Sequence, residues 1–172
     1  FWNASRFGMM NLEGYEPGPV DLASLPTEDR WILAGLDELI AETTAELGAF
    51  HFAEATRRLR EFAWGEFCDW YLEFVKTRLR EPATRPEALR VLASVLDSLC
   101  RLLHPIMPFL TEQIWQHLGE LAPSRGLPEP KAAEPSVCIA AWPKPLGLAD
   151  PEARAAVAQW QEKIQALRNV KA

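Results

Sequence analysis

Residues 50–80 constrain the fold most, because their apolar side chains recur at steps of three and four residues without an intervening proline. That spacing indicates one side of an α-helix. It predicts a single helix of roughly 28 residues, about 42 Å long at 1.5 Å per residue. We expect its inner side to contain Phe52, Ala55, Leu59, Phe62, Ala63, Phe67, Trp70 and Phe74. A helix of this length needs long helical partners, which favours a bundle.

The two stretches before this helix show similar spacing and have recognisable ends. Residues 1–14 fit a helix that finishes at Gly14, and two prolines soon follow. A second helix is predicted with Thr27 as its N-cap, acids in its first turn and Gly48 at its end. We expect the buried side of this second helix to contain Ile32, Leu36, Leu39, Ile40 and Leu47.

The stretch over 86–119 contains a narrow apolar seam and then two prolines, Pro105 and Pro108. A proline inside a helical pattern removes a hydrogen bond, so we expect a kink or a restart there. The seam consists of Leu89, Leu92, Leu96, Leu99 and Leu103. Together these stretches predict an all-α fold in which residues 1–119 form a bundle of four to five helices.

The remaining third of the chain has a different character. Residues 120–149 are rich in proline and alanine without helical spacing, which predicts a linker. Alternating β-branched residues favour a short strand or extended segment at 137–142. Residues 150–172 fit a trailing helix with Asp150 as its N-cap, leading toward a coiled coil outside the chain. Because both ends fall inside helical patterns, we expect an excised part of a longer protein.

Composition excludes several classes of protein. The 172 residues are 48% hydrophobic with a net charge of −6, which argues against a protein that coats nucleic acid, DNA included, through bulk positive charge. No apolar run approaches the roughly 20 residues needed to cross a membrane, and no signal peptide is visible. Three widely spaced cysteines indicate reduced thiols in the cytoplasm rather than a metal site. Phosphate-loop and hydrolase motifs are absent, so we expect neither a catalytic residue nor a cofactor in this chain.

Several separated motifs resemble one family. The stretch "WNASRFGMMNLEG" resembles the first anticodon-domain helix of valyl-tRNA synthetases, and "EFCDWYLEFVK" resembles the long helix that follows it. The stretch "HPIMPFLTEQIWQHL" is similar to a proline-broken helix shared by the valyl, isoleucyl and leucyl enzymes, and "SVCIAAWPKP" is similar to the valyl segment after the bundle. Order and spacing agree over nearly the whole chain.

This resemblance implies a fold and a function. The chain would be the anticodon-binding domain of a class I aminoacyl-tRNA synthetase whose parent joins valine to its tRNA with ATP and Mg²⁺. The catalytic and editing domains would lie outside the chain, which alone would be inactive. Its partners would be a tRNA with a valine-type anticodon loop and the catalytic domain of the same synthetase.

The first helix would supply one half of an anticodon site. Unpaired bases are read by stacking on aromatic or guanidinium planes and by hydrogen bonds along their edges. At 100° per residue, one side of this helix carries polar and large side chains. They are Asn3, Arg6, Phe7 and Met10, with Asn11 adjacent. Related enzymes place anticodon contacts on this helix, which favours Arg6 most. The alternative is that Phe7 and Met10 are core residues and Asn3 is merely solvated.

The long helix would supply the other half. Lys76 and Arg78 can reach phosphates, whereas Asp69 or Glu73 can accept from a base amino group. Trp70 lies beside this side of the helix, although we favour core packing as the explanation for it. Glu73 and Lys76 also have the spacing of an ordinary surface ion pair.

Two other functions fit parts of the sequence. An isoleucyl- or leucyl-type anticodon domain would share the fold but bind a different tRNA. A helical protein-interaction module would bind no RNA, and the acidic helix at 27–47 favours it slightly.

Overall fold

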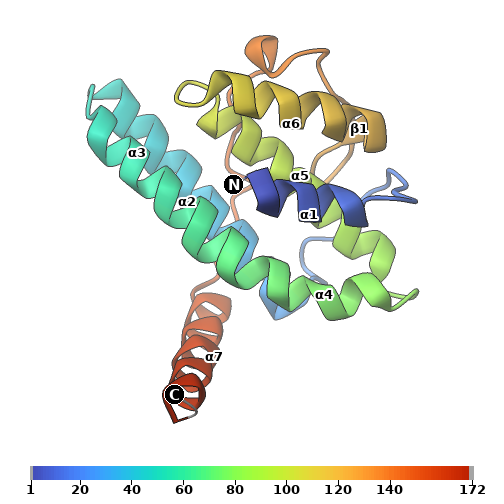
Figure 1. The fold of residues 1–172 in the computed structure, drawn as a ribbon, viewed down its shortest axis with the longest axis vertical. Coiled ribbons are helices and arrows are strands. Elements are labelled where there is room, and N and C mark those ends of the chain that lie inside the picture. Colours follow the sequence, from blue (N-terminus) through green and yellow to red (C-terminus); the bar gives the residue numbers. More distant parts are fainter. Residues whose placement is uncertain (1, 171–172) are drawn as a thin grey trace.

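The helices build one bundle from which the last helix projects (Figure 1). The computed structural model describes residues 2–170, with side chains over 5–169. The helical elements are α1 (Trp2–Asn11), α2 (Thr27–Gly48), α3 (Phe52–Arg60), the π-helix η1 (Glu61–Tyr71), α4 (Leu72–Arg80), α5 (Arg85–Leu103), α6 (Pro108–Leu121), the short 3₁₀ helix η2 (Val137–Ile139) and α7 (Pro151–Val170). The all-α prediction is confirmed.

Helix α5 forms the centre of the bundle, because nearly every side chain from Ala88 to Leu103 is buried. Helix α1 lies close against it: a Cβ added at Gly8 would sit 3.1 Å from the Leu96 Cδ1 atom. On the inner side of α1, Met9 and Leu12 are buried.

The predicted long helix is present as the continuous rod α3–η1–α4. Its middle is not α-helical: residues 61–71 are wound as a π-helix, which turns the chain less per residue than uniform α-helical spacing assumes. The predicted inner side is buried at Ala55, Leu59 and Phe67, but Phe52 is exposed at the turn after α2.

One predicted helix cap and one predicted core residue were altered by the structure, whereas the break after residue 103 was not. Helix α2 begins at Thr27 with Pro26 as the capping residue, whose carbonyl accepts from the amide of Arg30 at 3.0 Å. The proline break is confirmed, and the imidazole Nδ1 of His104 lies 2.8 Å from the hydroxyl of Thr111 across it. Leu47, expected in the core, is half-buried.

Of the two alternatives given for 137–142, a short strand or an extended segment, the strand is wrong. Residues Val137–Ile139 form a 3₁₀ turn, because the hydroxyl of Ser136 accepts from the amide of Cys138 at 3.1 Å. Pairing occurs earlier, where β1 (Ser124–Arg125) runs antiparallel to β2 (Lys131–Ala132). Alternating apolar residues over so short a stretch occur both in strands and in turns that bury one residue, so the pattern does not distinguish the two.

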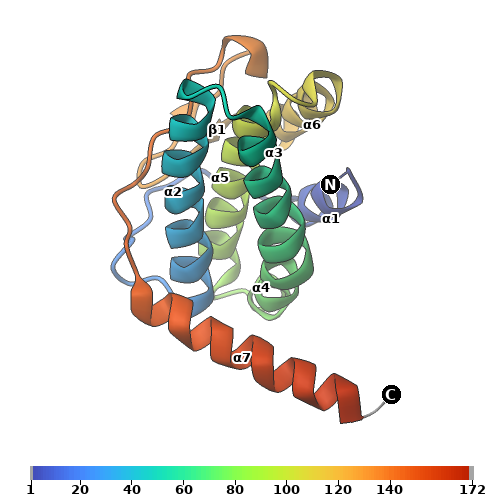
Figure 2. The same ribbon diagram turned by 90° about the vertical axis from the view of Figure 1, so that its left-hand side faces the viewer.

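Residues 122–149 lie along the bundle as a covering layer rather than extending freely (Figure 2). The Asp37 carboxylate accepts from the amides of Leu146 and Leu148, both at 2.7 Å. The indole Nε1 of Trp142 donates to the hydroxyl of Thr44 at 2.8 Å. These bonds fix the path of the chain into α7.

Candidate nucleic-acid interface

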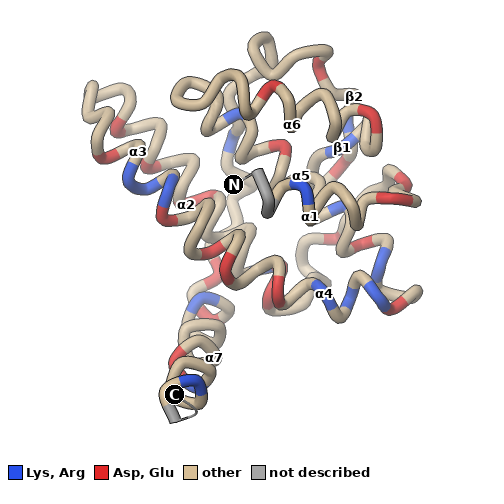
Figure 3. The backbone as a smooth tube through the Cα atoms, in the orientation of Figure 1, with Lys and Arg blue, Asp and Glu red and all other residues tan. Residues whose placement is uncertain are grey.

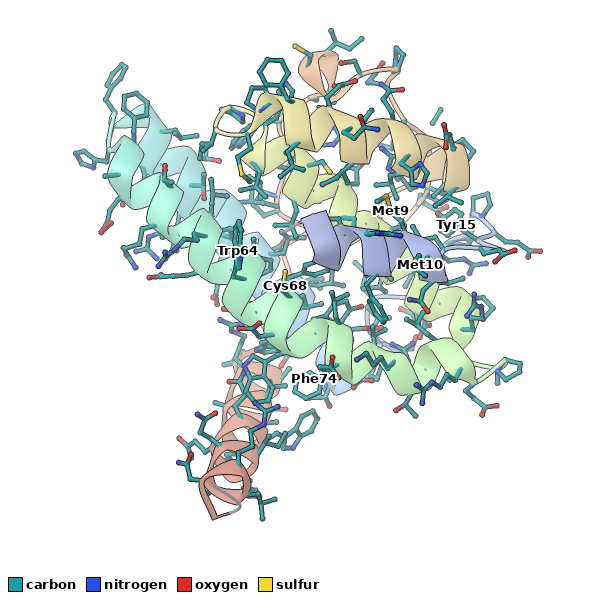
Figure 4. All side chains as sticks on the ribbon, in the orientation of Figure 1. Met9, Met10, Tyr15, Trp64, Cys68 and Phe74 are labelled. Atoms are coloured by element: carbon teal, nitrogen blue, oxygen red, sulfur yellow. The ribbon has the colours of Figure 1, made fainter. Side chains whose placement is uncertain are left out.

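The outer side of α1 exposes the predicted site residues for which side chains are described. Met10 is 70% exposed, Phe7 is half-buried, and Arg6 is exposed without an acidic partner among the described residues. Figure 4 shows the face on which Met10 lies. The Asn3 side chain lies outside the described residues. A large exposed apolar side chain beside an unpaired guanidinium suits contact with a flat, charged ligand.

Helix α4 joins α1 on this face. The Lys76 ammonium nitrogen lies 5.3 Å from the centroid of the Phe7 ring and forms an ion pair with Glu73. A cation over a ring is attracted to its negative face. The structure therefore brings together the two halves of the predicted site, which are 69 positions apart in the sequence (76 − 7).

The amide of Asn11 is partly occupied. Its Nδ2 donates to the carbonyl of Phe7 at 2.8 Å within α1. The Oδ1 atom accepts no hydrogen bond from the described residues and stays available as an acceptor. Since the amide nitrogen carries two N–H groups, Asn11 keeps one donor and its Oδ1 acceptor for the edge of a base.

Asp69 and Trp70 lie on η1 and behave differently. Asp69 is exposed to solvent. Trp70 is half-buried, with its ring centroid 5.7 Å from that of Phe74. The guanidinium carbon of Arg168, on α7, lies 5.6 Å from the centroid of the Trp70 ring. Trp70 therefore takes part in helix packing, and α7 occupies the surroundings in which a base would have to stack.

Arg78 has a structural role that the sequence did not reveal. Its guanidinium bonds to the fully buried Asp29 carboxylate and to Glu87, the latter at 2.8 Å. The hydroxyl of Tyr71 donates to the same Asp29 carboxylate at 2.9 Å. Burial raises the pKa of Asp29 to about 6, against the opposing influence of Arg78 and Tyr71. The Arg78 side chain is committed to this network and only 11% exposed, so the structure does not support a phosphate contact.

Two arginines that the sequence analysis missed hold the segment after α1. Arg85 donates to the carbonyls of Asn11 and Glu13, both at 2.9 Å, and Arg90 donates to that of Glu16 at 3.1 Å. Backbone acceptors outside helices need such partners. The sequence shows only a loop without helical spacing between two helices. Such a pattern does not identify which side chains donate to the carbonyls of the loop.

Positive charge gathers along the end of α4 and the start of α5 (Figure 3). The residues are Lys76, Arg78, Arg80 and Arg85. Of these, Arg80 is exposed and has no acidic partner among the side chains described. The face defined by Arg6, Phe7, Met10, Lys76 and Arg80 thus combines cations with apolar surface, and we call it the α1–α4 face.

These features agree with one family of proteins. Residues 29–172 match the family described as "Anticodon-binding domain of tRNA ligase". Since that match covers most of the chain, the chain belongs to this family of anticodon-binding domains. Helix α1 precedes the matched region and is placed by comparison with individual proteins.

Those proteins are valine–tRNA ligases. The chain is 45% identical over 172 residues to the enzyme of Rhodopirellula baltica, and this covers 99% of the chain and 17% of that protein. It is 44% identical over 175 residues to the enzyme of Geobacter sulfurreducens and 42% identical over 182 residues to that of Symbiobacterium thermophilum. In both cases 99% of the chain is covered, and the chain spans 17–20% of the length of these three relatives.

Proposed function

We propose that this domain binds the anticodon loop of a valine-type tRNA through the α1–α4 face. The observation that carries the proposal is the similarity to valine–tRNA ligases over 99% of the chain, α1 included. The Lys76–Phe7 contact supports it, because it assembles one surface from the two helices whose sequences resemble that family. The relatives named above are valine–tRNA ligases, which favours a valine-type anticodon over an isoleucyl- or leucyl-type one.

Each group on the face has a chemical use. The Arg6 guanidinium can stack on a base or form two hydrogen bonds to its edge. Lys76 and Arg80 can bind phosphates, since neither lies in a buried ion pair. The carboxylates of Asp69 and Glu73 and the Oδ1 of Asn11 can accept from base amino groups. Phe7 and Met10 supply apolar surface on which a base can lie.

We further propose that the domain works within a longer cytoplasmic ligase that joins valine to tRNA. ATP and Mg²⁺ would bind in the catalytic domain of that protein, with no cofactor in this chain and no role in binding DNA. None of the helices in residues 2–170 is both long and apolar enough to cross a membrane. Phe50 and Phe52, where α2 passes into α3, and Phe109, in the first turn of α6, are 59–90% exposed and would be available to pack against the catalytic domain.

Fluorescence anisotropy with a labelled valine-type tRNA tests the proposal. Binding should be measured at low and at moderate salt beside a tRNA whose two defining anticodon bases are changed. We expect tighter binding to the unaltered anticodon at both salt concentrations. Equal binding to both tRNAs that disappears as salt rises would reduce the interaction to phosphate attraction and overturn anticodon recognition.

A further inference from the structure

Helix α7 is firmly held at its start and exposed beyond it. The Asp150 carboxylate caps the helix by accepting from the amide of Ala153 at 2.8 Å, and Arg154 forms an ion pair with Glu66 of η1. Ala153 and Val157 are buried against the bundle. After Val157, the described side chains are half-buried or exposed. The first two turns therefore fix the direction in which the remainder projects.

A row of aromatic side chains sets the position of this projecting part. The centroids of Trp160 and Phe74 lie 6.0 Å apart with an interplanar angle of 82°, an edge-to-face contact. Phe74 in turn contacts Trp70, over whose ring Arg168 is placed. Figure 4 shows Phe74 at the junction between α4 and α7. The row guides Arg168 to the outer surface of η1.

The projecting end of α7 lies on the same side of the bundle as α1 (Figures 1 and 2). The outer surface of η1 and α4 lies between them and includes Asp69, Glu73 and Arg80, all exposed. Helical rotation places Trp70 about 120° from Lys76 around the rod, treating its turns as α-helical. Lys76 thus faces α1, whereas Trp70 faces α7, and one surface has a cation at each edge.

Arg168 has the properties of a phosphate-binding group. It is exposed and has no acidic partner in the described part of the chain. A guanidinium placed over an indole keeps its N–H groups free at the edge of the plane, where they can donate to phosphate oxygens. In a chain of net charge −6, such local cations must supply the attraction for RNA.

We propose that α7 forms the second edge of the RNA-binding surface, with Arg168, held over Trp70, binding a phosphate of the RNA strand that lies across α4. The proposal rests on the function proposed above and adds a contact from an element outside the predicted site. A phosphate contact positions the RNA and carries no sequence information. Arg168 should therefore affect affinity and its salt dependence, but leave the preference for the anticodon unchanged.

The test compares Arg168→Ala with Lys163→Ala, which removes the same charge from α7 about 140° around the helix. Anisotropy with the labelled valine-type tRNA is recorded over a series of salt concentrations. We expect Arg168→Ala to weaken binding about 3- to 10-fold and to lower the slope of log K against log salt by about 0.7–0.9, the value for one phosphate contact. Lys163→Ala should stay within about twofold of the wild type, since no RNA is expected on its side.

Two further measurements make the result decisive. Arg168→Lys keeps the charge but loses the planar contact with Trp70, and should bind with intermediate affinity. Thermal unfolding should be unchanged by all three substitutions, since both side chains are exposed. If Arg168→Ala and Lys163→Ala bind equally well, the α7 contact is overturned even when the wild type distinguishes anticodons. If the wild type does not distinguish them, the proposed function itself fails.

Discussion

The two sides of α4 use cations of the same kind for opposite purposes. On the inner side, Arg78 reaches the buried Asp29 carboxylate and holds α4 against α2 and α5. On the outer side, two residues earlier, Lys76 lies over Phe7 and forms an ion pair with Glu73, its one acidic partner among the described side chains. The difference is in burial: the inner pair is shielded from water, whereas the outer pair is screened by it.

This contrast separates stability from binding. Removing one member of a buried pair leaves the other charged and unpaired, which costs far more than the pair itself contributes. Removing an exposed cation costs the fold at most about 1 kcal/mol, so its loss should be visible mainly when RNA is bound. Substitutions on the two sides should therefore affect different measurements.

Arg78→Ala should give the largest effect. Because Asp29 would keep only Tyr71 as a hydrogen-bond donor from a side chain, the free energy of unfolding should fall by about 3–5 kcal/mol. Chemical denaturation followed by circular dichroism measures this. Arg80→Ala, an exposed cation two residues later, is the matched control and should change stability by less than about 0.5 kcal/mol. Similar losses in both variants would remove the distinction between the two sides.

Comparison of Asp29→Asn with the wild type should show how the buried Asp29 carboxylate makes stability depend on pH. The folded-state pKa of about 6 lies above the ordinary value of 3.8, so the folded state binds the proton more tightly. Stability from this group is therefore fully present below about pH 4 and is lost as the pH rises through about 6. Relative to the wild type, Asp29→Asn should become progressively more stable across this range in thermal unfolding. A constant difference in melting temperature would contradict the raised pKa.

Arg6→Ala tests the exposed α1–α4 face. We expect about tenfold weaker binding of the valine-type tRNA in the anisotropy assay, equal to about 1.4 kcal/mol, because a guanidinium contact to a base is lost. The melting temperature should hardly change, since Arg6 is exposed and forms no ion pair with a described residue. A large fall in melting temperature would make Arg6 structural and remove it from the site.

Lys76→Ala should have the smallest effect of the four. A single phosphate contact and one exposed cation–π contact are lost, so binding should weaken about three- to fivefold and stability by about 0.5–1 kcal/mol. Lys76→Arg keeps both interactions and should bind nearly as well as the wild type. If Lys76→Ala binds RNA normally while losing stability, the Phe7 contact serves packing alone.

Local patterns in the sequence were sufficient for most of the fold. Apolar spacing, the glycine after α1 and the two prolines after α5 identify the helices and their order. The failed strand at 137–142 came from a pattern of only two β-branched residues, Val137 and Ile139, of which one is buried and the other exposed. A pattern this short does not determine a backbone conformation.

The site depended more on distant contacts. Neither the Asp29–Arg78 pair nor the Lys76–Phe7 contact follows from helical periodicity, because each joins residues from different elements. Surface spacing alone placed Arg78 beside Lys76 in the predicted site. Only the packing of α4 between α1, α2 and α5 determines which cation remains available to RNA.

The π-helix η1 gives the rod one further property. If the segment Glu61–Tyr71 kept its winding, loss of one of its residues would turn α4 around the rod axis by the rotation of one residue, which is about 100° in an α-helix and somewhat less in a π-helix. Lys76 would then leave Phe7, and Arg78 would leave Asp29, while α3 kept its orientation. The number of residues in this segment, as distinct from their identity, sets the angle at which α4 meets α1.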